Sequence, residues 1–438
     1  LGGSGALSAI IDPVVSSFAA ARQTGEFQEF FAQYQRHIKG YADNLSDPAV
    51  QELLADMAVQ VDYMIASLNA PRWSGDYPAS TRIQQFMNKT ENAFFYLNGQ
   101  YFADTRNRTA AAIGTATRFG RHTNKSFKDL PKNMKTVIDN NGITPAEWEI
   151  ARKFTKDFRG DKVLDIEIIE IVSDKLIDQI IVSKNLKPSK YQRMITRDDI
   201  QRKFRQMYND ENSYAIISAD VRSRAMMYGA QPAGSVMGLI RKMFWQFKQY
   251  PVQFAKSVIG REIYSLNSFG NKAMNIGAVL TATTMAGYLA LTLEDLRKGK
   301  TMRDPMDNTT WQAAFLKGGG LGIYGDFLYN ISQNRFGQSA LITVAGPTVG
   351  DLKTAVDAMS AAYNGDFDAS SDNITRLVMS NIPYSNHFLM KPVADYIIMN
   401  SIREWMSPGS LQRAEDKLKK DTGQEYMFFE PSQMRLFK

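Results

Sequence analysis

The chain has 438 residues, of which 44% are hydrophobic and 22% charged, as is ordinary for globular proteins. This composition excludes a wholly disordered chain and argues against a transporter with many membrane spans. There is no cysteine, which excludes disulfides, thiolate nucleophiles and cysteine-bound metals, and the formal net charge is +7. The only histidines, His37, His122 and His387, lie far apart and outside any metal-binding motif. The sequence therefore predicts neither a metal site nor a cofactor.

The chain begins with Leu1 and a glycine-rich stretch instead of a methionine. No basic segment precedes its first apolar run, so we expect no signal peptide. We interpret the chain as a processed product or a fragment of a larger protein.

Helix signals dominate the first half of the chain. Asp47-Pro48 is typical of a helix start and is followed by apolar residues at helical spacing. The turn Asn141-Gly142 precedes Thr144-Pro145-Ala146-Glu147, which predicts a capping box with proline in the first helical turn. Thr196 with Asp199 indicates a second cap, opening a helix over 198–208.

Residues 163–182 are ambiguous, because isoleucines favour a strand while the apolar spacing also follows a helical stripe. About five turns is too long for an ordinary strand, so we predict a helix here. No repeated strand–helix–strand pattern occurs elsewhere. The predicted fold class is all-α, an extended assembly of helices.

Two glycine-rich joints divide the second half of the chain. Residues 229–234 precede a basic segment, and residues 317–322 predict a flexible turn. We expect an N-terminal helical region over 1–215 and a C-terminal basic and apolar region over 216–438. Residues 336–350 are uncharged but too short for a confident membrane span.

The net charge is concentrated in residues 221–273, where eight basic residues oppose Glu262 alone and leave an excess of seven, the formal charge of the whole chain. From residue 240 the apolar residues recur at helical spacing, with Pro251 expected to kink the helix. Such a helix could contact nucleic acid or lipid phosphate, or could be a soluble amphipathic helix with solvated lysines. The candidate phosphate-contacting residues are Arg222, Arg224, Arg241, Lys242, Lys248, Lys256 and Arg261.

The next 21 residues, 273–293, carry no charge. A helix of that length spans roughly 31 Å, the thickness of the hydrocarbon core of a bilayer. Small residues spaced four apart suit close packing between helices, in a membrane bundle or in a soluble core. A helix that is buried first and exposed to lipid later would reconcile the two readings. The candidate packing residues are Gly277, Ala278, Ala282, Ala286, Gly287 and Ala290.

Enzyme signatures are absent from the sequence. There is no phosphate-binding glycine loop and no nucleophile elbow, and the glycines near Gly318 lie outside any strand–helix context. Carboxylate pairs such as Glu167 and Glu170 have the spacing of helix faces. We therefore expect a protein that is not an enzyme.

The order of motifs from Gly238 onward resembles the C-terminal part of the large internal virion protein of short-tailed bacteriophages. The resemblance rests on an aromatic box over 243–250, the uncharged helix with Thr284-Met285-Ala286-Gly287-Tyr288, the step Asp304-Pro305-Met306, and Asn381-Ile382-Pro383 near the closing helices. The N-terminal third departs from the pattern, which leaves the domain boundaries open.

This resemblance implies a core or ejection protein, stored inside the virion and moved to the host cell envelope during infection. Such a protein would form a homo-oligomeric ring or tube for genome delivery. Its partners would be other internal virion proteins or the portal, double-stranded DNA and the host inner membrane. A soluble scaffold of the virion core, or the non-catalytic part of a larger muramidase-bearing protein, remains the alternative.

Overall fold

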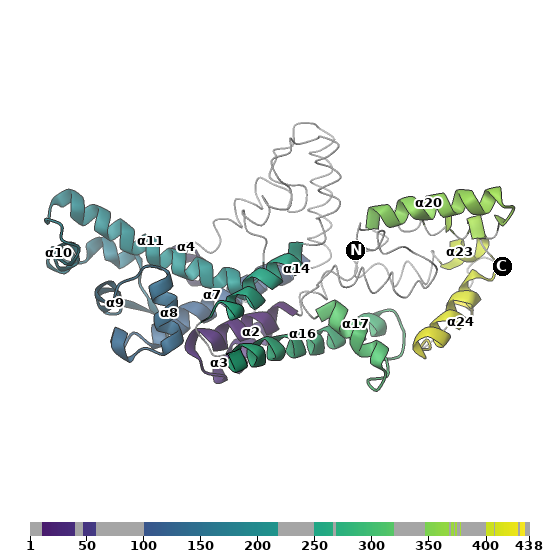
Figure 1. The fold of residues 1–438 in the computed structure, drawn as a ribbon, viewed down its shortest axis with the longest axis horizontal. Coiled ribbons are helices and arrows are strands. Elements are labelled where there is room, and N and C mark those ends of the chain that lie inside the picture. Colours follow the sequence, from purple (N-terminus) through teal and green to yellow (C-terminus); the bar gives the residue numbers. More distant parts are fainter. Residues whose placement is uncertain are drawn as a thin grey trace, which may run out of the picture. The chain divides into compact units, whose positions relative to one another are not determined.

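The computed structural model describes residues 11–39, 47–57, 100–217, 249–265, 269–318, 347–367, 369–371, 373–374, 377, 400–406, 408–427 and 430–433. These residues are mainly helical, which confirms the predicted all-α class (Figure 1). The chain divides into two compact units. The N-terminal unit is Asp12–Pro78 with Asp104–Ile217, and the C-terminal unit is Leu1–Ile11, Ala79–Ala103 and Ser218–Lys438.

The N-terminal unit has one large apolar core, built around Phe119, Trp148, Phe204 and Tyr208, all almost fully buried. Most helices of this unit and a two-stranded hairpin contribute residues to the core. The helices are α2 (Ile11–Thr24), α3 (Gln28–Ile38), α4 (Pro48–Asp56), α7 (Gln100–Arg121), α8 (Lys132–Asn140), α9 (Pro145–Ala151), α10 (Asp174–Ser183) and α11 (Lys190–Ala215), with 3-10 turns η1 (Phe127–Asp129) and η2 (Glu167–Ile171).

Two of the predicted helix starts are confirmed. Asp47 caps α4, its side chain accepting a hydrogen bond from the Ala49 amide at 2.9 Å. Thr144 and Glu147 form the reciprocal capping box of α9, with bonds of 3.3 and 2.8 Å. Glu147 is fully buried and also pairs with Lys203 at 3.0 Å, so one carboxylate both caps α9 and ties it to α11.

The helix predicted over 163–182 is wrong in its first half. Strand β1 (Thr155–Phe158) pairs antiparallel with β2 (Asp161–Leu164), and η2 follows before α10 begins. The turn between the strands holds Arg159 at φ 55° and Gly160 at φ 84°, as a tight hairpin requires. Val163 pairs with Lys156 of β1, so this β-branched residue has the extended conformation that it favours.

The second predicted cap is also wrong. Helix α11 begins eight residues earlier than expected, and the side chain of Ser189 accepts the Gln192 amide at 3.1 Å. Thr196 is buried inside the helix, and Asp199 pairs with Lys203. A capping pair and a pair on the same helix face have the same spacing, which explains the error.

The C-terminal unit contains the uncharged segment as predicted, within one long helix, α16 (Phe269–Arg297). Its other described elements are α14 (Gln249–Phe254), a π-helical turn (Ala255–Gly260), α15 (Arg261–Ile263), α17 (Asn308–Gly318), α20 (Pro347–Tyr363), α23 (Asn400–Met406), α24 (Ser410–Thr422) and the 3-10 turn Pro431–Gln433. Pro251 lies inside α14, and the π-helical turn begins after that helix ends. The kink expected at Pro251 stays a prediction.

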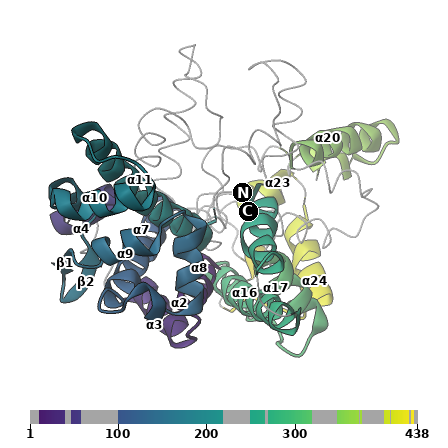
Figure 2. The ribbon, with the colours of Figure 1, turned by 60° about the vertical axis from the view of Figure 1, so that its left-hand side comes forward.

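Helices α16 and α17 pack side by side and form the α16–α17 hairpin, seen in both ribbon views (Figure 1, Figure 2). Of the turn predicted over 317–322, Lys317 and Gly318 belong to α17 instead, and the other residues lie outside the described part of the chain. In the uncharged stretch 336–350, residues 347–350 open α20 and the others lie outside the described residues.

Candidate functional site: the α16–α17 hairpin

Most of the candidate phosphate-contacting residues cannot be placed. Lys256 is exposed on the π-helical turn and Arg261 is half-buried at the start of α15. The remaining candidates lie outside the described residues: Arg222, Arg224, Arg241, Lys242 and Lys248. The site that the described residues define is therefore the α16–α17 hairpin.

Two glycines bring the backbones of the hairpin into contact. A Cβ atom on Gly287 would lie 2.2 Å from the carbonyl oxygen of Ala314, and one on Gly318 would lie 1.9 Å from that of Thr283. Both distances are far shorter than any real contact, and the opposing atoms are backbone. Only glycine fits at these two positions, so the small-residue pattern sets the distance between the helices.

The stripe of small residues faces the partner helix over only part of its length. Ala286, Gly287 and Ala290 are buried, and Ala282 is half-buried, whereas Gly277 and Ala278 are exposed. A four-residue repeat drifts by roughly 40° per step around a helix of 3.6 residues per turn. The stripe thus winds away from α17 toward the N-terminal end of α16.

The opposite face of α16 is apolar and open to solvent. Met274, Met285 and Leu289 are 65%, 60% and 45% exposed, and they recur at helical spacing. On α17, Trp311 and Phe315 are also partly exposed, and the Trp311 ring stacks on Tyr288 with centroids 5.3 Å apart. The hairpin therefore has a buried, closely packed contact between its helices on one side and an apolar outer surface on the other.

Three threonine hydroxyl groups within the uncharged segment bond to the helix itself. The Thr283 side chain donates to the Val279 carbonyl at 2.9 Å, and Thr284 donates to the Leu280 carbonyl at 2.7 Å. Further along, Thr292 donates to the Tyr288 carbonyl at 3.0 Å. These threonines need no water as a partner, which lowers the cost of placing the segment in an apolar phase.

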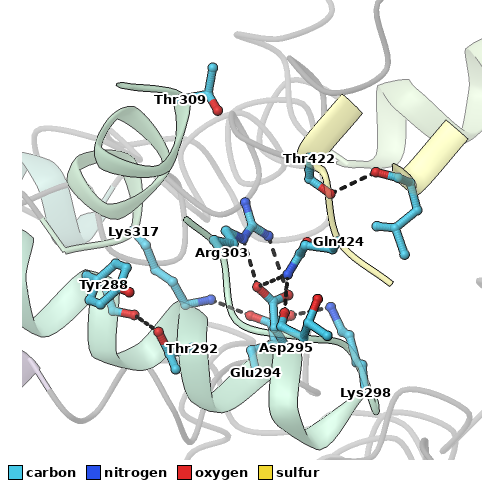
Figure 3. Close-up of polar contacts among 12 residues, drawn as sticks. Tyr288, Thr292, Glu294, Asp295, Lys298, Arg303, Thr309, Lys317, Thr422 and Gln424 are labelled. Carbon is cyan, nitrogen blue, oxygen red and sulfur yellow. Dashed lines mark hydrogen bonds and ion pairs between the residues drawn. The ribbon is translucent and has the colours of Figure 1, made fainter. Parts of the chain in front are cut away.

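Charged groups gather where the uncharged segment ends. Glu294 accepts from Lys298 at 2.6 Å and from Lys317 at 2.5 Å, and the Lys317 side chain is only 2% exposed (Figure 3). Asp295 pairs with Arg303 at 2.7 Å. Each carboxylate thus has a cation against it, and the buried ammonium of Lys317 is neutralised within the hairpin.

Residues near the C-terminus form hydrogen bonds with the charged end of α16 and the turn after it. The Gln424 amide donates to Asp295 at 3.0 Å and to the Thr301 carbonyl at 2.6 Å (Figure 3). Backbone bonds join Met427 to Gly299 at 2.7 Å and Thr301 to the carbonyl of residue 425 at 2.9 Å. Burial lowers the pKa of the neighbouring Lys300 to about 8, with repulsion from Lys298 adding to the shift.

The uncharged helix and its small residues were predicted from the sequence, whereas α17, the ion pairs and the hydrogen bonds from the C-terminal residues were not. One signal was available, because Glu294 and Asp295 directly follow the uncharged run and Lys317 precedes a glycine cluster. Nothing in the sequence shows that Gln424 would reach Asp295, 129 residues away.

Comparisons with models of protein families, with curated proteins and with solved structures gave no match. The function must therefore be argued from the residues of the chain.

Proposed function

We propose that the chain is a membrane-engaging protein and that the α16–α17 hairpin is the part that enters the bilayer. The observation that carries this proposal is the exposure of α16. Of its most apolar stretch of 18 residues, 33% is buried, whereas the core helix of a soluble bundle would be mostly buried. The satisfied threonines and the internal charge pairs add support, because both reduce the cost of transfer from water.

The wider proposal is an internal virion protein of a short-tailed bacteriophage. In this role the chain forms a homo-oligomeric ring or tube that conducts the genome across the host cell envelope, and it moves from the virion interior to the inner membrane. The order of motifs along the second half of the sequence supports this role. The role needs no enzymatic activity from this chain, and peptidoglycan zymography tests that, since a zone of clearing would instead indicate a muramidase.

Flotation with liposomes tests membrane entry. We expect the wild-type chain to float with vesicles and the double variant Met285→Glu/Leu289→Glu to float at least tenfold less. Both side chains are exposed, so the substitutions leave the seam with α17 intact. Met359→Glu is the control, since Met359 is 73% exposed on α20 and does not belong to the α16–α17 hairpin. Equal flotation of all three proteins would count against entry through this face of α16, and no flotation of the wild type would favour the soluble scaffold instead.

Contact with DNA is the second part of the proposal, and the concentration of positive charge in residues 221–273 supports it. Each phosphate neutralised contributes roughly 0.9 to the slope of log K against log salt concentration. We expect neutralisation of Lys248, Lys256 and Arg261 together to lower that slope by about 3 in a fluorescence titration with duplex DNA. An unchanged slope would reject contact through these residues.

A further inference from the structure

Helix α3 is amphipathic, but its polar side faces the interior of the N-terminal unit. Glu29, Gln33 and His37, spaced four apart, are 8%, 0% and 3% exposed. Their partners are on α7. Arg121 bonds to Glu29 at 3.0 Å, the Gln33 amide donates to the Ala110 carbonyl at 3.0 Å, and the His37 ring bonds to Asn107 at 3.3 Å.

A buried arginine completes this polar layer. Arg118 is 2% exposed and donates to Gln23 at 2.7 Å and to Gln33 at 2.8 Å. The Gln33 side chain can lie against the backbone of α7 only because residue 114 is a glycine. A Cβ atom there would lie 1.9 Å from the Gln33 side-chain oxygen. The rotational orientation of α3 is therefore fixed by hydrogen bonds that any rotation about its axis would break.

The outward side of α3 is aromatic and apolar. Phe27, Phe31 and Ile38 are 62%, 56% and 59% exposed, and Tyr34 lies between them on the same face. The spacing of four, three and four residues is that of the contact seam of a coiled coil. The rings are already in contact, with Phe27 and Phe31 centroids 5.4 Å apart and Phe30 stacked on Tyr34 at 6.2 Å. We call these four seam residues the α3 face.

The surroundings of the α3 face distinguish between its possible occupants. An interfacial lipid-binding helix places cations beside its apolar face, and a surface that binds single-stranded nucleic acid combines rings with a basic groove. Along its length the α3 face is flanked instead by two exposed neutral residues, Gln28 and Gln35. The cations near it lie at its C-terminal end, where exposed Lys39 follows the helix and Arg106 donates to the Ile38 carbonyl at 3.4 Å. Neutral flanks allow two identical faces to meet without repulsion between like charges.

The charges at the two ends of α3 favour one arrangement of two copies. Glu26 precedes the helix and Lys39 follows it, and both are exposed. When two copies pack antiparallel, Glu26 of each lies near Lys39 of the other, and the two helix dipoles oppose. A parallel arrangement would instead place like charges together at both ends.

We propose that the α3 face is a self-association surface, through which two copies of this chain pack antiparallel. The inference rests on the homo-oligomeric part of the proposed function and names the surface that would serve it. The exposed parts of Phe27, Phe31 and Ile38 offer on the order of 300 Å², given about 200 Å² for each large side chain. A stable dimer buries about 800 Å² per partner, so this contact alone is weak and reversible and strengthens where several contacts act together.

Analytical ultracentrifugation of the full chain over a range of concentrations tests the proposal. We expect Phe31→Glu and Ile38→Glu each to weaken association at least tenfold, because each places a carboxylate in the seam. Met359→Glu, at a more exposed position on α20, is the control and should leave association unchanged. Circular dichroism checks that the helices persist. Association that is the same in all four proteins would overturn the proposal.

The absence of cysteine from the chain allows a second test that does not depend on weakening the fold. In the antiparallel arrangement Gln28 of one copy lies beside Gln35 of the other. Mild oxidation of a mixture of Gln28→Cys and Gln35→Cys proteins should therefore give a mixed disulfide dimer faster than either protein alone. Faster dimers from each protein alone would indicate a parallel contact, and no dimers would reject the α3 face as a contact between copies.

The two proposals fail in different assays. If the wild-type protein failed to float with vesicles, the membrane proposal would be wrong and the association data would be unaffected. If Phe31→Glu reduced flotation but not association, the α3 face would bind lipid and the self-association proposal would be wrong.

Discussion

Adding one methyl group at Gly287 is the sharpest test of how the α16–α17 hairpin is held together. In Gly287→Ala the new Cβ would lie 2.2 Å from the Ala314 carbonyl oxygen, and no side chain can rotate to relieve the clash. The helices must separate by about 1 Å, and overpacking of this kind costs roughly 1–3 kcal/mol. Alanine also gains up to about 1 kcal/mol over glycine in helix propensity. When the full gain applies, the net destabilisation is about 0–2 kcal/mol, and relative to an alanine that meets no clash in the same helix it is about 1–3 kcal/mol.

Gly277→Ala in the same helix is the matched control. A Cβ atom there would meet nothing within 4 Å, so only the propensity gain remains and α16 should become up to about 1 kcal/mol more stable. Hydrogen exchange followed by mass spectrometry, on peptides from residues 283–318, measures the local opening free energy of the hairpin. Equal protection of the two variants would refute the close backbone contact on which the hairpin depends.

Three further predictions concern stability. Burial, together with the charges of Arg106 and Arg118, lowers the pKa of His37 to about 4 from an unfolded value of about 6.5, so the folded N-terminal unit disfavours the protonated ring. Its stability should fall by about 3 kcal/mol as the pH falls from 6.5 to 4, and urea denaturation of His37→Gln should show a smaller fall. Glu294→Gln leaves the buried ammonium of Lys317 without its carboxylate and should cost about 3 kcal/mol by hydrogen exchange, whereas no loss would mean the pair is solvated. Thr144→Ala removes half of a capping box and should cost about 1 kcal/mol in urea denaturation followed by circular dichroism, with an unchanged midpoint counting against the cap.

Local signals in the sequence were read correctly where one interaction decides the structure. Thr144 and Glu147 lie three residues apart, and the capping box needs nothing else. The uncharged stretch likewise predicts a long helix by itself. The errors arise where a partner distant in sequence decides: Val163 joins a strand because β1 lies beside it, and Thr196 is inside α11 because Ser189 starts that helix.

The candidate site was predictable only as a segment. Length and lack of charge pointed to residues 273–293, and small residues indicated close packing, but the four-residue repeat could not show which glycine meets a partner. That depends on α17, which places Gly318 against Gly287 and leaves Gly277 free of contact. The reversed polarity of α3 was equally hidden, because its polar face is buried only through side chains of α7.

Depth-dependent quenching in vesicles tests the central claim most directly. Since the chain has no native cysteine, an environment-sensitive fluorophore on Met285→Cys reports that position alone, and one on Met359→Cys serves as the reference. With vesicles that contain brominated lipids, we expect the label at position 285 to shift to the blue and to be quenched, while the reference label is not. If both labels keep the emission they show in water while the protein is bound to vesicles, the α16–α17 hairpin does not enter the membrane.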